Sequence, residues 1–271
     1  MYLFDALKAM GPAERAKAVK AVSEFHWRYP IAKEAEYGRM LSDYLVASVN
    51  DTIKLSVQTL IFRQDGPEEY EPDLSAIIAF GNTVSDFTVG QWAALMQMGV
   101  GIAYDAANPA VRATVESWAR TQVTLITKAD DDMRQKVWNR VTAGVKNGWL
   151  NETIRDTIME DMPGITERRA KLIARDQVSK LRAMLSRQCM EEAGFQTYVW
   201  STAGDERVRP SHSSMEGKVC RWDDETACMG VNGWEPRPGD AVMLHPGMDI
   251  QCRCVAAVND AEMDELDAAE E

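Results

Sequence analysis

Apolar side chains recur at helical spacing through the first three-quarters of the chain. Between residues 32 and 62 they return at steps of three and four, which places one apolar face along an amphipathic helix. The positions on this face are Met40, Leu41, Tyr44, Leu45, Ser48, Val49 and Ile53. A shorter helix is predicted from Pro12 to Trp27, because proline suits a first helical turn and Pro30 stops the run.

Residues that end helices divide the following stretch into shorter segments. These segments are expected to begin near Asp73, Val89, Pro109 and Asp131. Gly81 and Gly90 indicate breaks or close contacts between helices. Asn147-Gly148 is a suitable C-terminal stop for the last of these segments.

A turn at Pro163-Gly164 is predicted to separate a short helix over residues 151–160 from a longer helix that ends near Ala193. Thr166 would cap the longer helix. The turn also resembles the helix-hairpin-helix signature, which offers backbone N–H groups to a phosphate, although Thr166 replaces its second glycine. A capped helix with a solvated basic face is the favoured interpretation, and phosphate binding is the weaker alternative.

The pattern changes to alternating aromatic and β-branched residues from Phe195 to Trp200, which is typical of a β-strand. From Ala203 to Cys254 glycine and proline are too frequent for long helices, and residues 255–258 could close a small sheet. The predicted fold class is therefore α+β. A mostly α-helical N-terminal and middle region with long amphipathic helices precedes a small C-terminal α/β module with a short sheet and many loops.

These changes of pattern divide the chain into four segments. Residues 1–150 form a helical region suited to docking and assembly, residues 151–195 form helices leading into the module, and residues 196–258 form the compact C-terminal module. Residues 259–271 form a tail that carries acids and no bases from Asp260 onward, a composition typical of a disordered terminus. A docking role for this tail toward a basic partner is the less favoured alternative.

Composition and charge exclude several classes of protein. Hydrophobic residues make up 45% of the 271 residues and charged residues 27%, as in an ordinary folded soluble protein. We expect no membrane span, because no stretch approaches the roughly 20 apolar residues needed, and no signal peptide, so a cytosolic origin is the default. The 30 basic and 42 acidic residues give a net charge of −12, which argues against general DNA binding.

Histidine and cysteine gather near the C-terminus, where they offer ligands for a metal. Thiolate and imidazole select zinc, and four ligands would complete a structural site. The candidates are His212, His245, Cys252 and Cys254, with Cys220 and Cys228 in reserve. Because only one residue separates Cys252 from Cys254, the favoured interpretation is that both thiols are small buried hydrophobic groups, and structural Zn²⁺ is the alternative.

A hydrolytic site is a further alternative in the same region. Acid–base or metal-assisted chemistry could use Asp205, His212, Asp223, Asp224 and His245. The sequence has no nucleophile elbow, no phosphate-binding glycine loop and no His-Glu-x-x-His helix. The favoured interpretation is that Asp205 orders a turn, while Arg207 and Arg209 hold loops in place.

Strings over about residues 165–258 are similar, in their order along the chain, to those of the phage Mu F-protein-like family. They include Trp200-Ser201-Thr202, Asp205-Glu206-Arg207-Val208-Arg209, Trp222-Asp223-Asp224, His245-Pro246-Gly247 and Cys252-Arg253-Cys254. The residues that carry the match are Arg169, Arg175, Asp176, Gln177, Trp200, Asp205, Arg207, Arg209, Gly217, Trp222, Pro246, Gly247 and Arg253. The segment from Glu225 to Gly239 looks like an insertion between the motifs.

The resemblance implies a minor head (head morphogenesis) protein of a tailed bacteriophage. Such a protein would be made in the bacterial cytoplasm, would reside in the virion near the portal, and would not be an enzyme. Its implied partners are the portal protein and major capsid or scaffold proteins, with contact to packaged DNA as an open alternative. Its implied role is to support head assembly and DNA packaging or delivery. The alternative is a metal-dependent, nuclease-like hydrolase built on the C-terminal Asp/His/Cys cluster.

Overall fold

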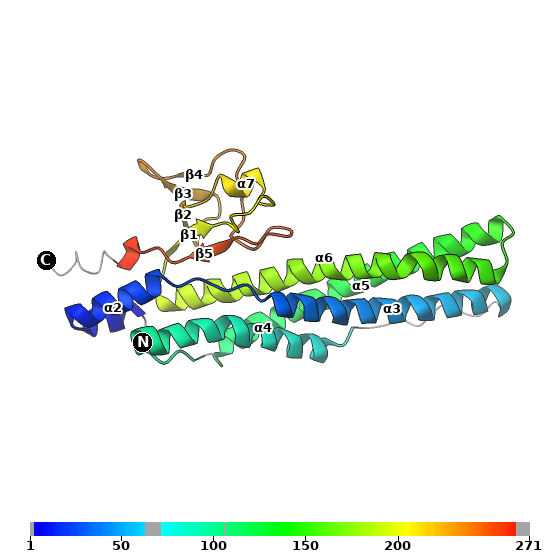
Figure 1. Cartoon of the computed structure of the whole chain (residues 1–271), viewed down its shortest axis with the longest axis horizontal. Helices are drawn as coiled ribbons and strands as arrows, with labels where there is room; N and C mark the ends of the chain where they lie inside the picture. Colours follow the sequence, from blue (N-terminus) through cyan, green and yellow to red (C-terminus); the bar gives the residue numbers. More distant parts are fainter. Residues whose placement is uncertain (1–2, 63–71, 106, 264–271) are drawn as a thin grey trace. The chain divides into compact units, whose positions relative to one another are not determined.

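The computed structural model describes residues 3–62, 72–105 and 107–263. It is 65% helical with a few short antiparallel strands near the C-terminus, which confirms the α+β class (Figure 1). The helices are α1 (Leu3–Ala9), α2 (Pro12–Ser23), α3 (Ile31–Phe62), α4 (Leu74–Leu95), the π-helix η1 (Met96–Val100), α5 (Pro109–Lys146), α6 (Asn151–Ala193) and α7 (Pro210–Ser213). The strands are β1 (Thr197–Ser201), β2 (Val219–Arg221), β3 (Ala227–Gly230), β4 (Gly233–Pro236) and β5 (Val255–Ala257).

Local sequence signals fix most helix ends. The Asp73 carboxylate accepts hydrogen bonds from the backbone N–H groups of Ser75 (2.9 Å) and Ala76 (3.2 Å), which caps α4. Pro109 begins α5, as predicted. The left-handed glycines Gly148 (φ 70°) and Gly194 (φ 109°) follow the ends of α5 and α6, where a side chain would be strained.

The breaks predicted within three helices were wrong. α4 runs through Gly81 and Gly90, α5 runs through the boundary expected near Asp131, and α6 runs through Pro163-Gly164. Thr166 therefore does not cap a helix. It is buried inside α6, and its hydroxyl donates to the Met162 carbonyl at 3.0 Å, a local bond that competes little with the helix.

Because no turn interrupts α6, the helix terminus that the phosphate-binding alternative required is absent from this part of the described chain. Among the described residues, no helix combines the length and the apolar character that crossing a bilayer requires.

The chain divides into two compact units, each assembled from separated stretches of sequence. The first unit comprises Met1–Pro30, Asn82–Val115 and Val178–Glu271, and the second comprises Ile31–Gly81 and Glu116–Gln177. Three helices, α4, α5 and α6, contribute residues to both units. The units therefore interleave in sequence, unlike the four consecutive segments expected from the changes of pattern.

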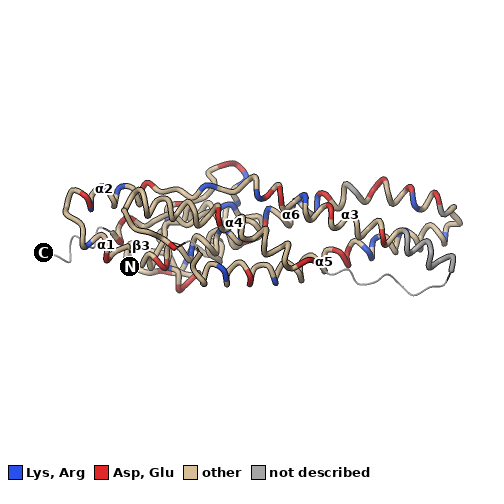
Figure 2. The backbone as a smooth tube through the Cα atoms, turned by 90° about the horizontal axis from the view of Figure 1, so that it is seen from below, with Lys and Arg blue, Asp and Glu red and all other residues tan. Residues whose placement is uncertain are grey.

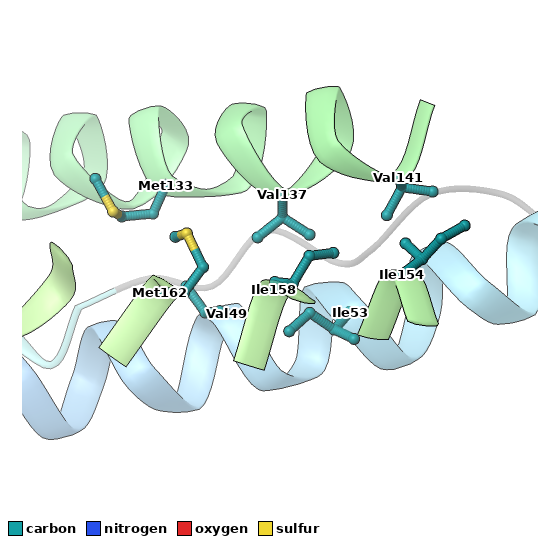
Figure 3. Packing of buried hydrophobic residues seen from close by; sticks show 8 residues of the cluster. All are labelled: Val49, Ile53, Met133, Val137, Val141, Ile154, Ile158 and Met162. Atoms are coloured by element: carbon teal, nitrogen blue, oxygen red, sulfur yellow. The ribbon is translucent and has the colours of Figure 1, made fainter. Parts of the chain in front are cut away.

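The core of the second unit lies where α3, α5 and α6 meet, and Figure 3 shows side chains of the three helices pointing toward one another. α3 contributes Val49 and Ile53, two positions of the predicted apolar face. The other members are Met133, Val137, Val141, Ile154, Ile158 and Met162, each at most 4% exposed. Steps of three and four along each helix produce this shared core, as the sequence pattern predicts.

In the first unit, β1 is the central strand of a three-stranded antiparallel sheet with the order β2-β1-β5. The predicted strand starting near Phe195 and the predicted closure by residues 255–258 are thus confirmed. β3 and β4 form a separate antiparallel hairpin (Figure 1).

The first residues of the predicted tail belong to this module. The Asn259 amide donates to the Thr197 hydroxyl at 2.7 Å, Glu262 accepts from the Gln196 backbone N–H at 2.9 Å, and Met263 is 1% exposed. Residues 264–271 lie outside the described residues.

We expect Ile158→Ala to lower the free energy of unfolding by about 2–5 kcal/mol, because it removes buried methyl groups and leaves a cavity among three helices. Leu172→Ala on the same helix is the matched control, since Leu172 is 52% exposed, and should change stability by no more than about 0.5 kcal/mol. Urea unfolding followed by circular dichroism measures both. Equal effects of the two substitutions would contradict this account of the core.

Candidate metal centre in the C-terminal module

Three of the four predicted zinc ligands come together in the first unit. The Nδ1 atom of His212 lies 3.4 Å from the sulfur of Cys252 and 3.4 Å from the sulfur of Cys254. The three ligand atoms lie within 4.8 Å of one another, and none of the side chains is more than 3% exposed. α7 supplies the histidine, and the loop before β5 supplies both cysteines.

A carboxylate fixes the orientation of the His212 ring. Nε2 of His212 lies 3.0 Å from Oδ2 of Asp249, and the same carboxylate oxygen pairs with the Arg209 guanidinium at 2.8 Å. Because a carboxylate accepts hydrogen bonds, Nε2 carries the proton and the lone pair of Nδ1 faces the two sulfurs. Arg209 also donates to the Ile250 carbonyl at 2.9 Å, which ties α7 to the cysteine loop.

The two thiols interact through a hydrogen bond. The hydrogen bond that Cys254 donates lowers the pKa of Cys252 to about 6 and raises the pKa of Cys254 itself. The Gly247 backbone N–H donates to the Cys252 sulfur at 3.3 Å. The wholly buried guanidinium of Arg182 attracts negative charge on both sulfurs, and no carboxylate of the described residues pairs with it. These contacts favour a thiolate in the apolar interior.

An unusual backbone conformation at Gln251 directs the cysteine loop toward His212. Gln251 has φ 56°, and among the described residues it is the one non-glycine residue with positive φ. Such a conformation costs on the order of 1–3 kcal/mol and persists where the surrounding contacts hold it. Cys252 follows directly. The loop conformation therefore places both sulfurs on one side.

Pro246 and Gly247 let this loop lie against α6. Pro246 is buried, and Gly247 has φ 82°. A Cβ atom at Gly247 would lie 2.7 Å from the Cβ of Ala183. On the same face of α6, the Ser179 hydroxyl donates to the Cys252 carbonyl at 2.6 Å. Glycine is thus required here both for its backbone conformation and for its lack of a side chain.

Arg253, which stands between the two cysteines, is held by Asp205. Its two terminal nitrogens contact the two carboxylate oxygens of Asp205 at 2.7 and 2.6 Å, a bidentate pair. Arg207 adds a third contact at 2.9 Å. The hydrogen bonds from Arg253 and then from Arg207 hold the pKa of Asp205 far below its usual range. The predicted role of Asp205 in ordering a turn extends to anchoring the cysteine loop.

His245 does not join the other three predicted ligands. Its Nδ1 atom lies 3.0 Å from the Tyr198 hydroxyl, and that hydroxyl accepts from Arg237 at 3.1 Å, so Tyr198 donates to an unprotonated Nδ1. Burial, followed by the charges of Arg187 and Arg237, lowers the pKa of His245 to about 4. The sequence placed His245 among the ligands on residue type alone, but the loop directs it into a separate polar contact.

Other residues of the family motif support the module around this centre. Trp200 on β1 is fully buried, with its ring 5.9 Å from the His212 ring, and Gly217 (φ 70°) donates its backbone N–H to the Trp200 carbonyl at 2.8 Å. Trp222 lies 4.2 Å from the Tyr198 ring, measured between centroids. These contacts shape the core of the module and leave the indoles away from solvent.

Four motif residues belong to the second unit. Arg169 pairs with Asp132 at 3.7 Å, and Arg175 pairs with Glu34 at 3.2 Å. The Gln177 amide donates to Asp176 at 2.8 Å, and the Gln177 oxygen accepts from Gln122 at 2.8 Å. The side chains of Arg169, Arg175 and Gln177 thus join helices of the bundle, while Asp176 contacts its neighbour Gln177.

The residues proposed for a hydrolytic site are dispersed. Asp223 pairs with its neighbour Arg221, and Asp224 accepts from the Thr226 hydroxyl at 2.7 Å within a turn. Cys220 and Cys228 are buried free thiols outside the His/Cys/Cys group. No shared acid–base pair forms among these candidates.

Sequence reasoning missed three residues that organise the module. Arg237 is 3% exposed and donates to the carbonyls of Val242 (2.7 Å) and Leu244 (2.9 Å). These hydrogen bonds hold the segment from Glu225 to Gly239 against the rest of the module. Asp249 contacts His212, and Arg182 contacts the Cys254 carbonyl, only because the chain folds to bring them there. The Pro-Arg-Pro string at residues 236–238 was the one signal in the sequence, because no spacing rule links Asp249 or Arg182 to the cysteines.

The fold and this centre define a class: a helical protein that carries a small antiparallel module with a buried His-Cys-Cys cluster. Residues 135–257 match the family described as "Phage Mu protein F like protein". The match over this segment agrees with the resemblance that the order of motifs predicted. The match begins about 30 residues before the predicted start near residue 165, and so includes the end of α5.

A protein of Haemophilus influenzae with the name "Uncharacterized protein" is 34% identical over 160 residues, which cover 59% of this chain and 32% of the relative. The chain thus spans about a third of the length of this curated relative. No solved structure matches the chain significantly.

We expect Gly247→Ala to destabilise the protein more than Gly204→Ala. Both glycines have positive φ (82° and 67°), which costs alanine about 1–2 kcal/mol, but nothing lies within 4 Å of a Cβ at Gly204. The overlap with Ala183 should add about 1–3 kcal/mol at Gly247. Denaturant unfolding of the two variants measures the difference, and equal losses would contradict the close packing of this loop on α6.

His245 should make stability depend on pH in a defined window. Its pKa is lowered from the ordinary value of 6.5 to about 4 in the folded state, so the unfolded chain takes up the proton first as the pH falls. The stability contributed by this group is therefore present above about pH 6.5 and is lost as the pH falls toward 4.

In His245→Gln the free energy of unfolding should fall less steeply between pH 7 and pH 5 than in the unchanged protein. Unfolding curves recorded at several pH values test this. Parallel pH profiles would show that His245 is not held neutral.

Proposed function

We propose that the protein is a head-associated structural protein of a tailed bacteriophage, which binds the portal protein or inner capsid and supports head assembly and DNA packaging or delivery. The match of residues 135–257 to the phage Mu F-like family carries this proposal. The proposed location is the virion head near the portal, after synthesis in the host cytoplasm.

The distribution of charge favours protein partners over nucleic acid. The net charge is −12, and Figure 2 shows basic and acidic positions interspersed along α3, α5 and α6. DNA binding without sequence preference depends on many basic side chains that neutralise phosphates together. The described parts of these helices offer no continuous basic stripe for that purpose.

Exposed apolar side chains gather where α5 ends and α6 begins. Trp138 is 45% exposed, Val145 49%, Trp149 44% and Leu150 73%. Large apolar and aromatic side chains clustered on a surface are typical of sites that bind other proteins. We assign this tip of the second unit as the portal or capsid contact.

The hydrolase alternative has less support. A general acid or base must reach its substrate within hydrogen-bond distance. Asp205 is instead engaged by Arg253 and Arg207, and His245 is engaged by Tyr198. The geometry therefore favours a structural role for the module's carboxylates.

Replacing the tip residues should weaken incorporation into phage heads. We expect Trp138→Gln combined with Leu150→Gln to reduce the amount of protein recovered with purified heads at least tenfold, because buried aromatic anchors each contribute more than about 1 kcal/mol to binding. The control is Met98→Gln combined with Val231→Gln, since these side chains are 83% and 99% exposed elsewhere. Normal recovery of the tip variant would overturn the assignment of this surface. Absence of the unchanged protein from heads would overturn the whole proposal.

A further inference from the structure

The His212, Cys252 and Cys254 side chains form the most complete set of metal ligands in the described part of the chain. We propose that they bind one Zn²⁺ ion through His212 Nδ1, Cys252 Sγ and Cys254 Sγ, with a water molecule as the fourth ligand. This inference concerns the chemistry of the module, and it holds whether or not the protein is a phage head component.

The distances suit zinc. With Zn–S bonds of about 2.3 Å and Zn–N bonds of about 2.0 Å in a tetrahedron, a bound nitrogen and sulfur would be about 3.5 Å apart. The two Nδ1–Sγ distances of 3.4 Å approach this value before any adjustment. Two thiolates and a neutral imidazole also match the ligand preference of zinc over harder divalent cations.

The outer contacts of His212 provide independent support. Histidine ligands of zinc commonly donate their second ring N–H to a carboxylate, which fixes the tautomer and raises the basicity of the ligating nitrogen. Here Nε2 faces the Asp249 carboxylate at 3.0 Å, and Arg209 holds that carboxylate at 2.8 Å. A histidine buried only for packing would not require its Nδ1 lone pair to face two sulfurs.

The surroundings of the two sulfur atoms also favour metal binding. Gly247 donates its backbone N–H to the Cys252 sulfur at 3.3 Å. The indole N–H of the fully buried Trp200 has no hydrogen-bond partner within bonding distance. Donors of this kind stabilise thiolates. When zinc binds, two S–Zn bonds and one N–Zn bond form, and the thiol protons still present pass to solvent.

The fourth ligand follows from the space beside the cluster. A cavity of about 20 Å³ adjoins all three ligands and is also lined by Arg207, Arg209 and Arg253. A polar cavity needs at least about 10–15 Å³ to hold one water molecule, so this cavity has room for one. His245, the fourth ligand predicted from the sequence, is engaged by Tyr198 and is not part of this site.

The first test is metal analysis of the full chain purified under reducing conditions with zinc present. We expect one zinc per chain. Replacement by Co²⁺ should give thiolate-to-cobalt charge-transfer absorption and the visible bands of a tetrahedral ion. Cys254→Ser should abolish both the binding of one metal ion per chain and the thiolate-to-cobalt absorption. Cys220→Ser and Cys228→Ser, which change other buried thiols of the module, should retain both.

Asp249→Asn provides a test that does not remove a ligand. Because the carboxylate orients His212, the variant should bind zinc about 10–100-fold more weakly, with one ion per chain retained, as measured by competition with a chromophoric chelator. Leu150→Gln is the matched control and should bind zinc normally, which separates this inference from the proposed docking tip. Absence of stoichiometric zinc and cobalt in the unchanged protein, or equal zinc affinity in Asp249→Asn, would overturn the proposal.

Discussion

The loop before β5 is fixed on one face of α6 by contacts to its backbone. Ser179 donates to the Cys252 carbonyl at 2.6 Å, Arg182 donates to the Cys254 carbonyl at 3.2 Å, and Gly247 passes directly over Ala183. These bonds satisfy buried carbonyl groups that would otherwise cost free energy. They also set the position of both sulfurs, so the geometry of the cluster depends on this one contact between helix and loop.

Polar side chains replace a large apolar core in the module. Asp205 anchors Arg253, Asp249 joins Arg209 to His212, and Arg237 binds the carbonyls of the segment between the Trp-Asp-Asp and His-Pro-Gly motifs. A small module with short strands buries limited apolar surface, and fully satisfied hydrogen bonds give its loops a single arrangement. A metal ion bound to three of its side chains would act in the same way, by joining α7 to the loop before β5.

The helical bundle follows a different principle. Its core in the second unit is an apolar seam of three helices, and its buried polar contacts, such as Gln122 with Gln177, connect those helices at one level. The turn between α5 and α6 carries exposed apolar side chains, as do Met159 and Leu172 on α6. A bundle of this kind suits a protein that presents a helical surface to larger partners.

The apolar periodicity of residues 32–62, the cap at Asp73 and the stop at Gly148 were sufficient to predict helices, because these signals act between residues near in sequence. The motif order was likewise sufficient to predict the family. Local signals failed at Pro163-Gly164, where α6 continues without a break.

The ligand set depended on contacts between distant residues. His212 and Asp249 are 37 positions apart, and His212 and Cys254 are 42 positions apart, so their approach depends on the path of loops over α6. Residue type alone could not separate His212, which faces the sulfurs, from His245, which faces Tyr198. The sequence specified which chemical groups were available, and the tertiary structure specified which of them meet, because side-chain direction in a loop is set by long-range packing.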